Sequence, residues 1–268
     1  MSDSSELSNL LVIAHQLADA AGTIALKYFR SADCGMANKL DHGFDPVTRA
    51  DREIESCIRS MLDELRPDDG ILGEEFASRR GSSRFTWVID PIDGTRSYIS
   101  GTPVWGILIA VNDGHSVVLG MIDQPFTGER FFGAGNRSWL SRAGNTVRQR
   151  TRSCARMEDA VLFTTFPEIG TSAERNAFSA VSRCARLTRY GMDCYAYALL
   201  AGGHIDLVIE AGLNTYDIQA PIGVIEASGG VVTDWNGGSA MNGGQVLAAG
   251  DARLHERVVS ILRNSADH

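Results

Sequence analysis

The sequence is poor in cysteine, and neither its cysteines nor its histidines form a zinc-binding pattern. The five cysteines are odd in number, scattered and without a CxxC pair, which argues against a disulfide framework and a zinc knuckle. They are Cys34, Cys57, Cys154, Cys184 and Cys194, and we expect them to be reduced and structural. The histidines show no HExxH or HxxxH spacing, and His204, just before an apolar run, is expected to pack in the core or behind the functional site.

Positive charge is also scarce. The chain has 25 Lys and Arg against 33 Asp and Glu, a formal net charge of −8. Nucleic-acid binding requires clustered Lys and Arg, so we expect no nucleic-acid partner. The arginine-rich stretch 142–156 is a local exception. We interpret it as a solvated loop and strand edge, with a phosphate or partner contact as the alternative.

Long hydrophobic runs and a leader signal are not evident in the sequence. We read no stretch as long enough to span a membrane. The first residues, MSDSSELSNL, lack the basic start of a secretory signal, so we expect a cytoplasmic protein with no membrane partner. With 268 residues and 44% hydrophobic content, the chain can bury a substantial core.

Two carboxylates flank a turn in the segment WVIDPIDGTRS, residues 87–97, after a short apolar strand. Oxygen ligands from Asp90 and Asp93 suit Mg²⁺, whose coordination is usually completed by waters and substrate phosphate. The amides of Gly94 and Thr95 are placed to meet a phosphate oxygen if a helix begins there. An ordinary Asp-rich turn is the alternative interpretation.

Two segments upstream also carry acids at element boundaries. In DPVTRADREIE, residues 45–55, Thr48 is expected to cap a helix with Asp51 in its first turn. Taken alone, Asp51 is better explained as a first-turn acid favoured by the helix dipole. The segment ILGEE, residues 71–75, predicts a short strand that ends in two acids.

A fourth segment follows near the C-terminus. Tyr216 and Asp217 open a predicted helix with Pro221 in its first turn, then a glycine pair and a strand. Taken alone, Asp217 could be the N-cap of that helix.

Hydrophobic periodicity predicts the remaining elements only coarsely. The strands after the first acidic motif indicate an antiparallel meander, and later helices and strands alternate. The predicted helices cover residues 7–29, 173–186, 194–201 and 252–263, and the predicted strands cover 104–111, 117–123, 129–132 and 205–210. No internal repeat or flexible linker divides the chain, so periodicity alone indicates one unit of mixed α and β structure.

With these four acidic segments in order, the chain resembles the inositol monophosphatase family of Mg²⁺-dependent, lithium-sensitive phosphatases. The resemblance implies a layered αβαβα sandwich: an N-terminal α+β half, residues 1–150, and a C-terminal α/β half, residues 151–268, in one compact catalytic unit. It also implies a homodimer. The segments TPVWGILIAV, VLGMIDQPFTGERFFG and VLAAGDARLHE are most similar to histidinol-phosphate phosphatases within the family.

The resemblance implies two or three Mg²⁺ ions per active site. Glu74, Asp90 and the Ile92 carbonyl correspond to ligands of the first ion, and Asp90, Asp93 and Asp217 to ligands of the second. Thr95 and Asp51 match the pair that orients and deprotonates the attacking water. Because a threonine hydroxyl is a weak base at neutral pH, we expect Thr95 to position the water and Asp51 to accept its proton. Glu75 is expected to support the site, and Lys39 matches a family lysine near it, with a surface lysine as the alternative.

Substrate choice depends on the leaving group, because the metal ions hold only the phosphoryl group that every candidate shares. Gly94 and Thr95 are expected to contact the same group. The resemblance makes L-histidinol phosphate the expected substrate, with Glu210 and then Asp193 as the acids that accept hydrogen bonds from its ammonium and imidazole. Both acids could instead make ordinary structural pairs. The alternatives are an inositol monophosphate or nucleotide 3′-phosphate phosphatase and, in another class, a non-catalytic regulatory binding protein on the same fold.

Overall fold

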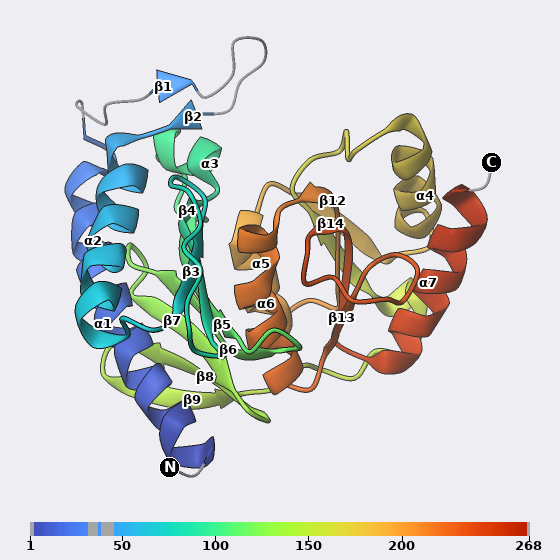
Figure 1. The fold of residues 1–268 in the computed structure, drawn as a ribbon. Helices are drawn as coiled ribbons and strands as arrows, with labels where there is room; N and C mark the ends of the chain where they lie inside the picture. The colour runs from blue at the N-terminus through green and yellow to red at the C-terminus, as the bar shows by residue number, and fades with distance from the viewer. Residues whose placement is uncertain (1–2, 32–36, 39–45, 267–268) are drawn as a thin grey trace.

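The computed structural model describes residues 3–31, 37–38 and 46–266, and in this part of the chain helices and sheets stack in five layers (Figure 1). The outer layer on one side holds α1 (Asp3–Tyr28) and α2 (Arg49–Leu65), and a seven-stranded sheet follows. Helices α5 (Asp193–Ala201) and α6 (Thr215–Ala227) lie between this sheet and a five-stranded sheet. Helices α4 (Ser172–Ser182) and α7 (Ala252–Ala266) cover the far side, so the predicted αβαβα sandwich is confirmed.

The seven-stranded sheet is a nearly continuous antiparallel meander. Only its first pair, β3 and β4, is parallel, and the neighbours then follow chain order. The strands are β3 (Gly70–Gly73), β4 (Thr86–Asp93), β5 (Gly106–Asn112), β6 (Val117–Gln124), β7 (Glu129–Ala134), β8 (Arg137–Arg142) and β9 (Asn145–Gln149). The predicted meander is correct and extends by two strands. The edge strand β9 lies in the arginine-rich stretch 142–156, which agrees with our interpretation of that stretch as a loop and strand edge.

The five-stranded sheet is mixed, with strand order β11-β10-β12-β14-β13. Its strands are β10 (Val161–Thr164), β11 (Leu187–Tyr190), β12 (Leu207–Leu213), β13 (Val231–Thr233) and β14 (Gly244–Ala249). Short elements complete the described chain: β1 (Ala37–Asn38), β2 (Pro46–Val47), α3 (Thr95–Ile99) and the 3₁₀ turn η1 (Met157–Asp159). Lys39 lies outside the described residues. His204 is exposed in the turn before β12, so its expected place in the core is wrong.

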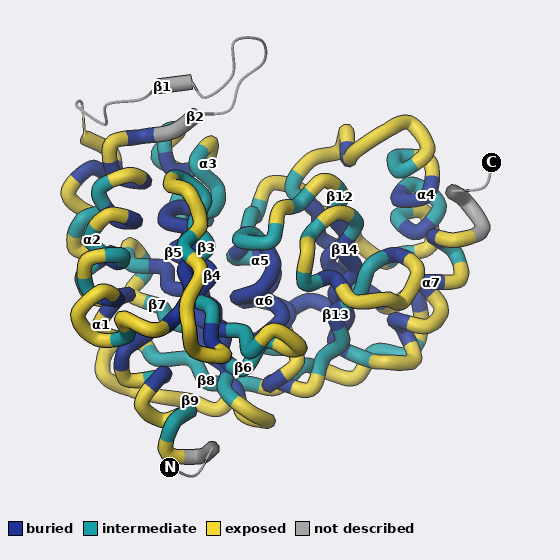
Figure 2. The backbone as a smooth tube through the Cα atoms, in the orientation of Figure 1, coloured by how far each residue is buried: buried dark blue, intermediate teal, exposed yellow. Residues whose placement is uncertain are grey.

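Helix α1 corrects the expectation about apolar runs. By length and composition alone, Ser5–Tyr28 would pass for a membrane-spanning helix. In the structure, 44% of its apolar 18-residue window is buried inside the protein, and the small and aliphatic side chains of one helix face, including Leu17 and Ala21, pack in the core against α2 and the sheet. A core helix with one buried face and one solvent-exposed face can have the same length and composition. Helix α1 is such a helix, and its buried and exposed residues alternate in Figure 2.

Helix α6 lies with its backbone directly on the seven-stranded sheet because three glycines face one another there. A Cβ on Gly120 of β6 would lie 2.3 Å from the carbonyl oxygen of Ala220, and one on Gly223 would lie 2.6 Å from the amide of Gly120. Gly133 of β7 approaches the same helix turn. This close packing fixes the start of α6, and with it Asp217, relative to the sheet. Most of α6 is buried in the layer between the sheets (Figure 2).

Candidate functional site

Strand β4 is longer than we expected, so that two of the predicted acids lie within it. The strand continues through Pro91 to Asp93, and its register with β5 shifts between Asp90 and Asp93. A proline is tolerated inside a sheet at such a bulge because no ladder hydrogen bond is required of its nitrogen. The Asp90 carboxylate accepts a hydrogen bond from the Ile92 amide at 3.1 Å. The bulge therefore holds the two acids close to each other.

Gly94 then turns the chain into α3 with a left-handed φ of +79°. A Cβ at this position would lie 2.8 Å from Cγ of Asp193, so the turn and the start of α5 pack directly on each other. The Thr95 hydroxyl donates to the Ile92 carbonyl at 3.1 Å, the carbonyl that the family resemblance assigns to a metal ion. The structure thus brings Gly94, Thr95, Ile92 and Asp193 to one corner.

The starts of α5 and α6 orient two carboxylates of the site. The Cys194 amide, in the first turn of α5, donates to Oδ2 of Asp93 at 2.7 Å. The Asn214 amide donates to Oδ2 of Asp217 at 2.6 Å, within a capping box. The N-cap of α6 is therefore Asn214, and the interpretation of Asp217 as the N-cap is wrong. Pro221 is also deeper than expected, in the second turn, where it has no N–H to give to the Asp217 carbonyl.

Asp90, Asp93 and Asp217 form a compact carboxylate cluster whose ligand atoms all lie within 4.8 Å of one another. Burial, followed by the charge of Glu74, raises the pKa of Asp90 well above its usual range. Burial also raises the pKa of Asp93, with further contributions from the charges of Asp193 and Asp217. Burial raises the pKa of Asp217 to about 6. Acids this close repel one another unless a cation lies between them, and all-oxygen donors fit a hard divalent ion.

Helix α2 brings Asp51 into the same region. Asp51 is buried, and its Oδ2 accepts from the Thr48 amide at 2.8 Å and the Thr48 hydroxyl at 2.5 Å, which confirms the predicted cap. Among the described residues, no group hydrogen-bonds to its Oδ1. Burial raises the pKa of Asp51 to about 7, with smaller contributions from the charges of Glu75 and Glu74. The Thr95 hydroxyl bonds to Ile92 and not to Asp51, so any joint action of the pair would pass through a bridging molecule.

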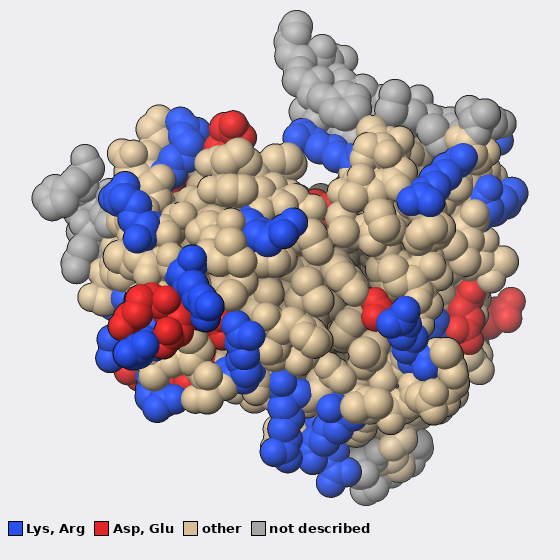
Figure 3. Space-filling model, turned by 180° about the vertical axis from the view of Figure 1, so that it is seen from behind, with Lys and Arg blue, Asp and Glu red and all other residues tan. Residues whose placement is uncertain are grey.

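A pocket of about 300 Å³ opens beside this cluster. Among the described residues, five carboxylates line it, against one guanidinium, that of Arg96, which lies over the Phe166 ring. The five are Glu74, Asp93, Asp193, Glu210 and Asp217. Asp51, Asp90 and Ile92 are buried and are not part of the pocket wall. Seen from behind, the surface is hollowed between the two halves, and acidic atoms are visible in the hollow (Figure 3).

Glu210 and Asp193 line the side of the pocket formed by the C-terminal half. Glu210 is buried and accepts from the Thr165 amide at 2.7 Å, the Thr165 hydroxyl at 2.9 Å and the Thr164 hydroxyl at 3.2 Å. Burial raises the pKa of Glu210 to about 7. Asp193 has a left-handed φ of 44° and accepts from the Ser97 hydroxyl at 2.5 Å. Burial also raises its pKa.

Sequence reasoning missed several residues that hold the site. Glu55 accepts from the Glu75 amide at 2.7 Å and from Arg59 at 2.8 Å, and so supports the chain next to Glu74. Its position four residues after Asp51, on the same helix face, was a signal that could have found it. Thr164 is the last residue of the buried strand β10 and Thr165 follows it, which was also a usable signal. Nothing in the sequence indicated the partners Ser97 and Asn214.

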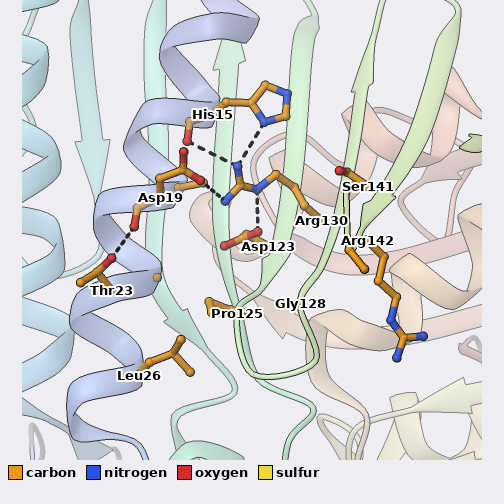
Figure 4. A pocket seen from close by; sticks show the side chains of 13 residues that line it. His15, Asp19, Thr23, Leu26, Asp123, Pro125, Gly128, Arg130, Ser141 and Arg142 are labelled. Carbon is orange, nitrogen blue, oxygen red and sulfur yellow. Dashed lines mark hydrogen bonds and ion pairs between the residues drawn. The ribbon is translucent and has the colours of Figure 1, made fainter. Parts of the chain in front are cut away.

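A second cavity, of about 460 Å³, lies between α1 and the ends of β6 to β8 (Figure 4). Its charged groups bond to one another: Arg130 donates to Asp123 at 2.7 Å, lies 2.8 Å from Asp19, and meets Nδ1 of His15 at 3.2 Å. Arg142 turns away from this cluster. We interpret these contacts as structural, because they hold α1 against the sheet.

The chain matches the model of the inositol monophosphatase family over residues 6–267. It is 39% identical to the bifunctional phosphatase IMPL2, chloroplastic, of Arabidopsis thaliana, over 96% of this chain and 76% of that protein. It is 31% identical to a histidinol-phosphatase of Chlorobaculum parvum, over 95% of this chain and 96% of that protein. A solved inositol monophosphatase from Zymomonas mobilis superimposes with a TM-score of 0.83 at 37% identity, over 98% of this chain and 99% of that one.

The layered fold and the acid-lined pocket, together with these likenesses, define a metal-dependent phosphatase. More closely, the chain belongs to the inositol monophosphatase family, whose members depend on a metal ion, typically Mg²⁺. The carboxylate cluster of Asp90, Asp93 and Asp217 is where such an ion fits.

Proposed function

We propose that this phosphatase hydrolyses L-histidinol phosphate to L-histidinol and phosphate, the activity of a step in histidine biosynthesis. The observation that carries the proposal is the charge of the pocket beyond the carboxylate cluster. Asp193 and Glu210 line the leaving-group side, so a leaving group that brings a positive charge is favoured there over a neutral one. Histidinol carries an ammonium and an imidazole, which supply that charge and several N–H donors.

The likenesses support the same substrate. One of the relatives reported above is named as a histidinol-phosphatase and another as a bifunctional phosphatase, and both are similar over nearly the whole of this chain. The similarity covers both halves, and therefore includes the region of Asp193 and Glu210 as well as the carboxylate cluster.

The chemistry we propose uses the residues around the cluster. Mg²⁺ held by the side chains of Glu74, Asp90, Asp93 and Asp217 and the Ile92 carbonyl would neutralise phosphoryl charge and stabilise the leaving oxygen. Two or three ions per site remain a prediction. The Gly94 and Thr95 amides hold a phosphoryl oxygen.

Asp51 accepts the proton of the attacking water in this scheme. Its Oδ1 has no protein partner among the described residues and is therefore free to accept a proton. In the metal-free protein, burial raises the pKa of Asp51 to about 7. The Thr95 hydroxyl has its proton engaged by the Ile92 carbonyl, so its oxygen can only accept a hydrogen bond from the water. Thr95 therefore positions the water, and Asp51 takes its proton.

An inositol monophosphate is the second candidate substrate. A sugar alcohol offers only hydroxyls, and the Glu210 carboxylate could accept from them without any positive charge. The superposition on the Zymomonas mobilis inositol monophosphatase favours this reading. A nucleotide 3′-phosphate shares the phosphoryl group but brings no cation to Asp193 and Glu210.

The test is Mg²⁺-dependent phosphate release from L-histidinol phosphate, inositol 1-phosphate, a nucleotide 3′-phosphate and fructose 1,6-bisphosphate. We expect the highest kcat/KM on histidinol phosphate, with loss on chelation and in Asp93→Asn. Preference for inositol 1-phosphate would retain the mechanism and discard the substrate. A metal-loaded protein that releases no phosphate from any ester would favour a regulatory binding protein. The cytoplasmic location and the homodimer also remain predictions, which fractionation of cells and light scattering would test.

A further inference from the structure

Among the described residues that line the pocket, the Tyr197 hydroxyl has no hydrogen-bond partner. Tyr197 lies on α5 and lines the pocket, with 4% of its surface exposed. Its hydroxyl is fully buried, and within the described part of the chain nothing hydrogen-bonds to it. Tyr197 is one helical turn after Asp193, so the two side chains share the helix face that looks into the pocket.

No acid accepts a hydrogen bond from the Tyr197 hydroxyl in the described structure. Glu210 is the charge that acts most strongly on Tyr197, but both of its oxygens already accept from Thr164 and Thr165. Burial and then the Glu210 charge raise the pKa of Tyr197 well above its usual range, so the phenol keeps its proton. The hydroxyl is therefore a donor without an acceptor in the described protein.

A buried hydroxyl without a partner is costly, and most such groups in native proteins are satisfied by a protein atom, a water or a ligand. Tyr197 lines the pocket, so a molecule bound there can supply the acceptor. The place of Tyr197 in the pocket also indicates which part of the substrate it contacts. The phosphoryl group belongs beside the carboxylate cluster, whereas Glu210 and Asp193 mark the leaving-group side.

We propose that the Tyr197 hydroxyl donates a hydrogen bond to an acceptor atom on the leaving group of the substrate. Together with Asp193 and Glu210 it forms a subsite of one donor and two acids. Such a subsite selects phosphate esters whose leaving group carries both a cationic nitrogen and an acceptor, such as a neutral aromatic ring nitrogen or a hydroxyl oxygen. This specificity role deepens the proposed function. Only the requirement for a cationic nitrogen rests on that function.

The test compares Tyr197→Phe with wild type on two cationic esters. Histidinol phosphate brings an ammonium and an acceptor nitrogen, whereas ethanolamine phosphate brings the ammonium without that acceptor. We expect the ratio of kcat/KM on the first ester to that on the second to fall about 10- to 50-fold, mainly through KM. The variant should fold at least as well as wild type, because it removes a buried hydroxyl that no described protein group satisfies.

Ser138→Ala is the matched control. Ser138 is fully buried on β8, its hydroxyl also has no partner in the described structure, and it is not in the pocket wall. Ser138→Ala should leave the ratio of the two esters unchanged while its melting temperature, like that of Tyr197→Phe, stays level or rises. A fall in the ratio in both variants would overturn the proposal, because the effect would then be one of packing.

Binding of the product provides a readout without turnover. By calorimetry, Tyr197→Phe should weaken L-histidinol about 10-fold or more and leave inorganic phosphate binding within about two-fold of wild type. Equal histidinol affinity in both proteins would overturn the role of Tyr197. If wild type instead prefers inositol 1-phosphate and Tyr197→Phe loses kcat/KM on that ester, the donor role stands and only the proposed substrate fails.

Discussion

Asp93 and Cys194, 101 residues apart, are joined by a hydrogen bond of 2.7 Å from the Cys194 amide to Oδ2 of Asp93. The bond links the end of β4 in one half of the molecule to the first turn of α5 in the other. A helix N-terminus favours a negative charge, so α5 stabilises the Asp93 carboxylate in the orientation that the cluster needs. The acidic site therefore depends on how the two halves pack.

Asp93→Asn should stabilise the metal-free protein while it abolishes turnover. In chelator at pH 8, the variant removes one of several buried acids that repel one another, and an asparagine oxygen can still accept from the Cys194 amide. We expect the free energy of unfolding to rise by about 1–3 kcal/mol, measured by denaturant titration. Mg²⁺ should then raise the melting temperature of wild type much more than that of the variant.

Asp113→Asn is the matched control for that experiment. Asp113 lies in the exposed turn between β5 and β6, where its carboxylate accepts from the His115 and Ser116 amides. Its replacement should leave the Mg²⁺-induced shift at the wild-type value. An Asp93→Asn protein that is less stable than wild type in chelator would contradict the picture of a repulsive cluster.

Asp51→Asn should separate catalysis from helix capping. An asparagine at this position can still accept from the Thr48 amide, so α2 should keep its N-terminus and most of its stability. Loss of the general base should lower kcat by about 100-fold or more. Steady-state kinetics and thermal unfolding measured on the same preparation check both expectations.

Thr48→Ala is the complementary variant. It removes the hydroxyl that accepts from the Ala50 amide and donates to Asp51, and should cost about 1 kcal/mol of stability. The Thr48 amide still donates to Asp51, so kcat should fall much less than in Asp51→Asn. If Asp51→Asn kept full turnover and lost only stability, Asp51 would be a capping residue alone, the alternative that its sequence position left open.

Glu210→Gln should change how stability depends on pH. Burial raises the pKa of Glu210 from 4.5 to about 7, so between these values the folded protein holds a proton that the unfolded chain has released. The contribution of this group is therefore fully present below pH 4.5 and is lost as the pH rises through about 7. The shift corresponds to about 3 kcal/mol.

The measurement is the difference in unfolding free energy between wild type and Glu210→Gln, in chelator, from pH 5 to 8.5. The difference cancels the titration of the other acids that both proteins share. Relative to wild type, the variant should gain stability as the pH rises across this window. A difference that stays constant with pH would show that Glu210 is not perturbed.

The features that the sequence predicts well are those set by neighbouring residues. The cap formed by Thr48 and Asp51, the amphipathic face of α1 around Leu17, and the antiparallel strands after Gly94 all depend on spacing within a few residues. The convergence of the acids was expected from the family resemblance, because four segments far apart in the chain carry no local signal that they meet.

The features that were misjudged depend on tertiary context. Local rules end a strand before Pro91 and place Pro221 in a first turn, but the bulge with β5 and the packing of α6 allow both prolines deeper positions. The unsatisfied hydroxyl of Tyr197 likewise cannot be predicted from the sequence, because it depends on which side chains of other elements pack around α5.

Gly120→Ala should weaken both the fold and the metal site. The new Cβ would lie 2.3 Å from the Ala220 carbonyl oxygen, so α6 must move away from the sheet at a cost of about 1–3 kcal/mol. Because α6 carries Asp217, the displacement should also raise the Mg²⁺ concentration needed for half-maximal activity.

Gly114→Ala is the comparison variant for this last prediction. Gly114 has a left-handed φ of +87° and nothing within 4 Å of its Cβ position, so its replacement should cost about 1 kcal/mol of backbone strain without moving α6. Denaturant unfolding and Mg²⁺ titration of activity should show a stability loss in both variants but a changed metal requirement in Gly120→Ala alone. If Gly120→Ala required the same Mg²⁺ concentration as wild type, the packing of α6 on the sheet would not be what positions Asp217.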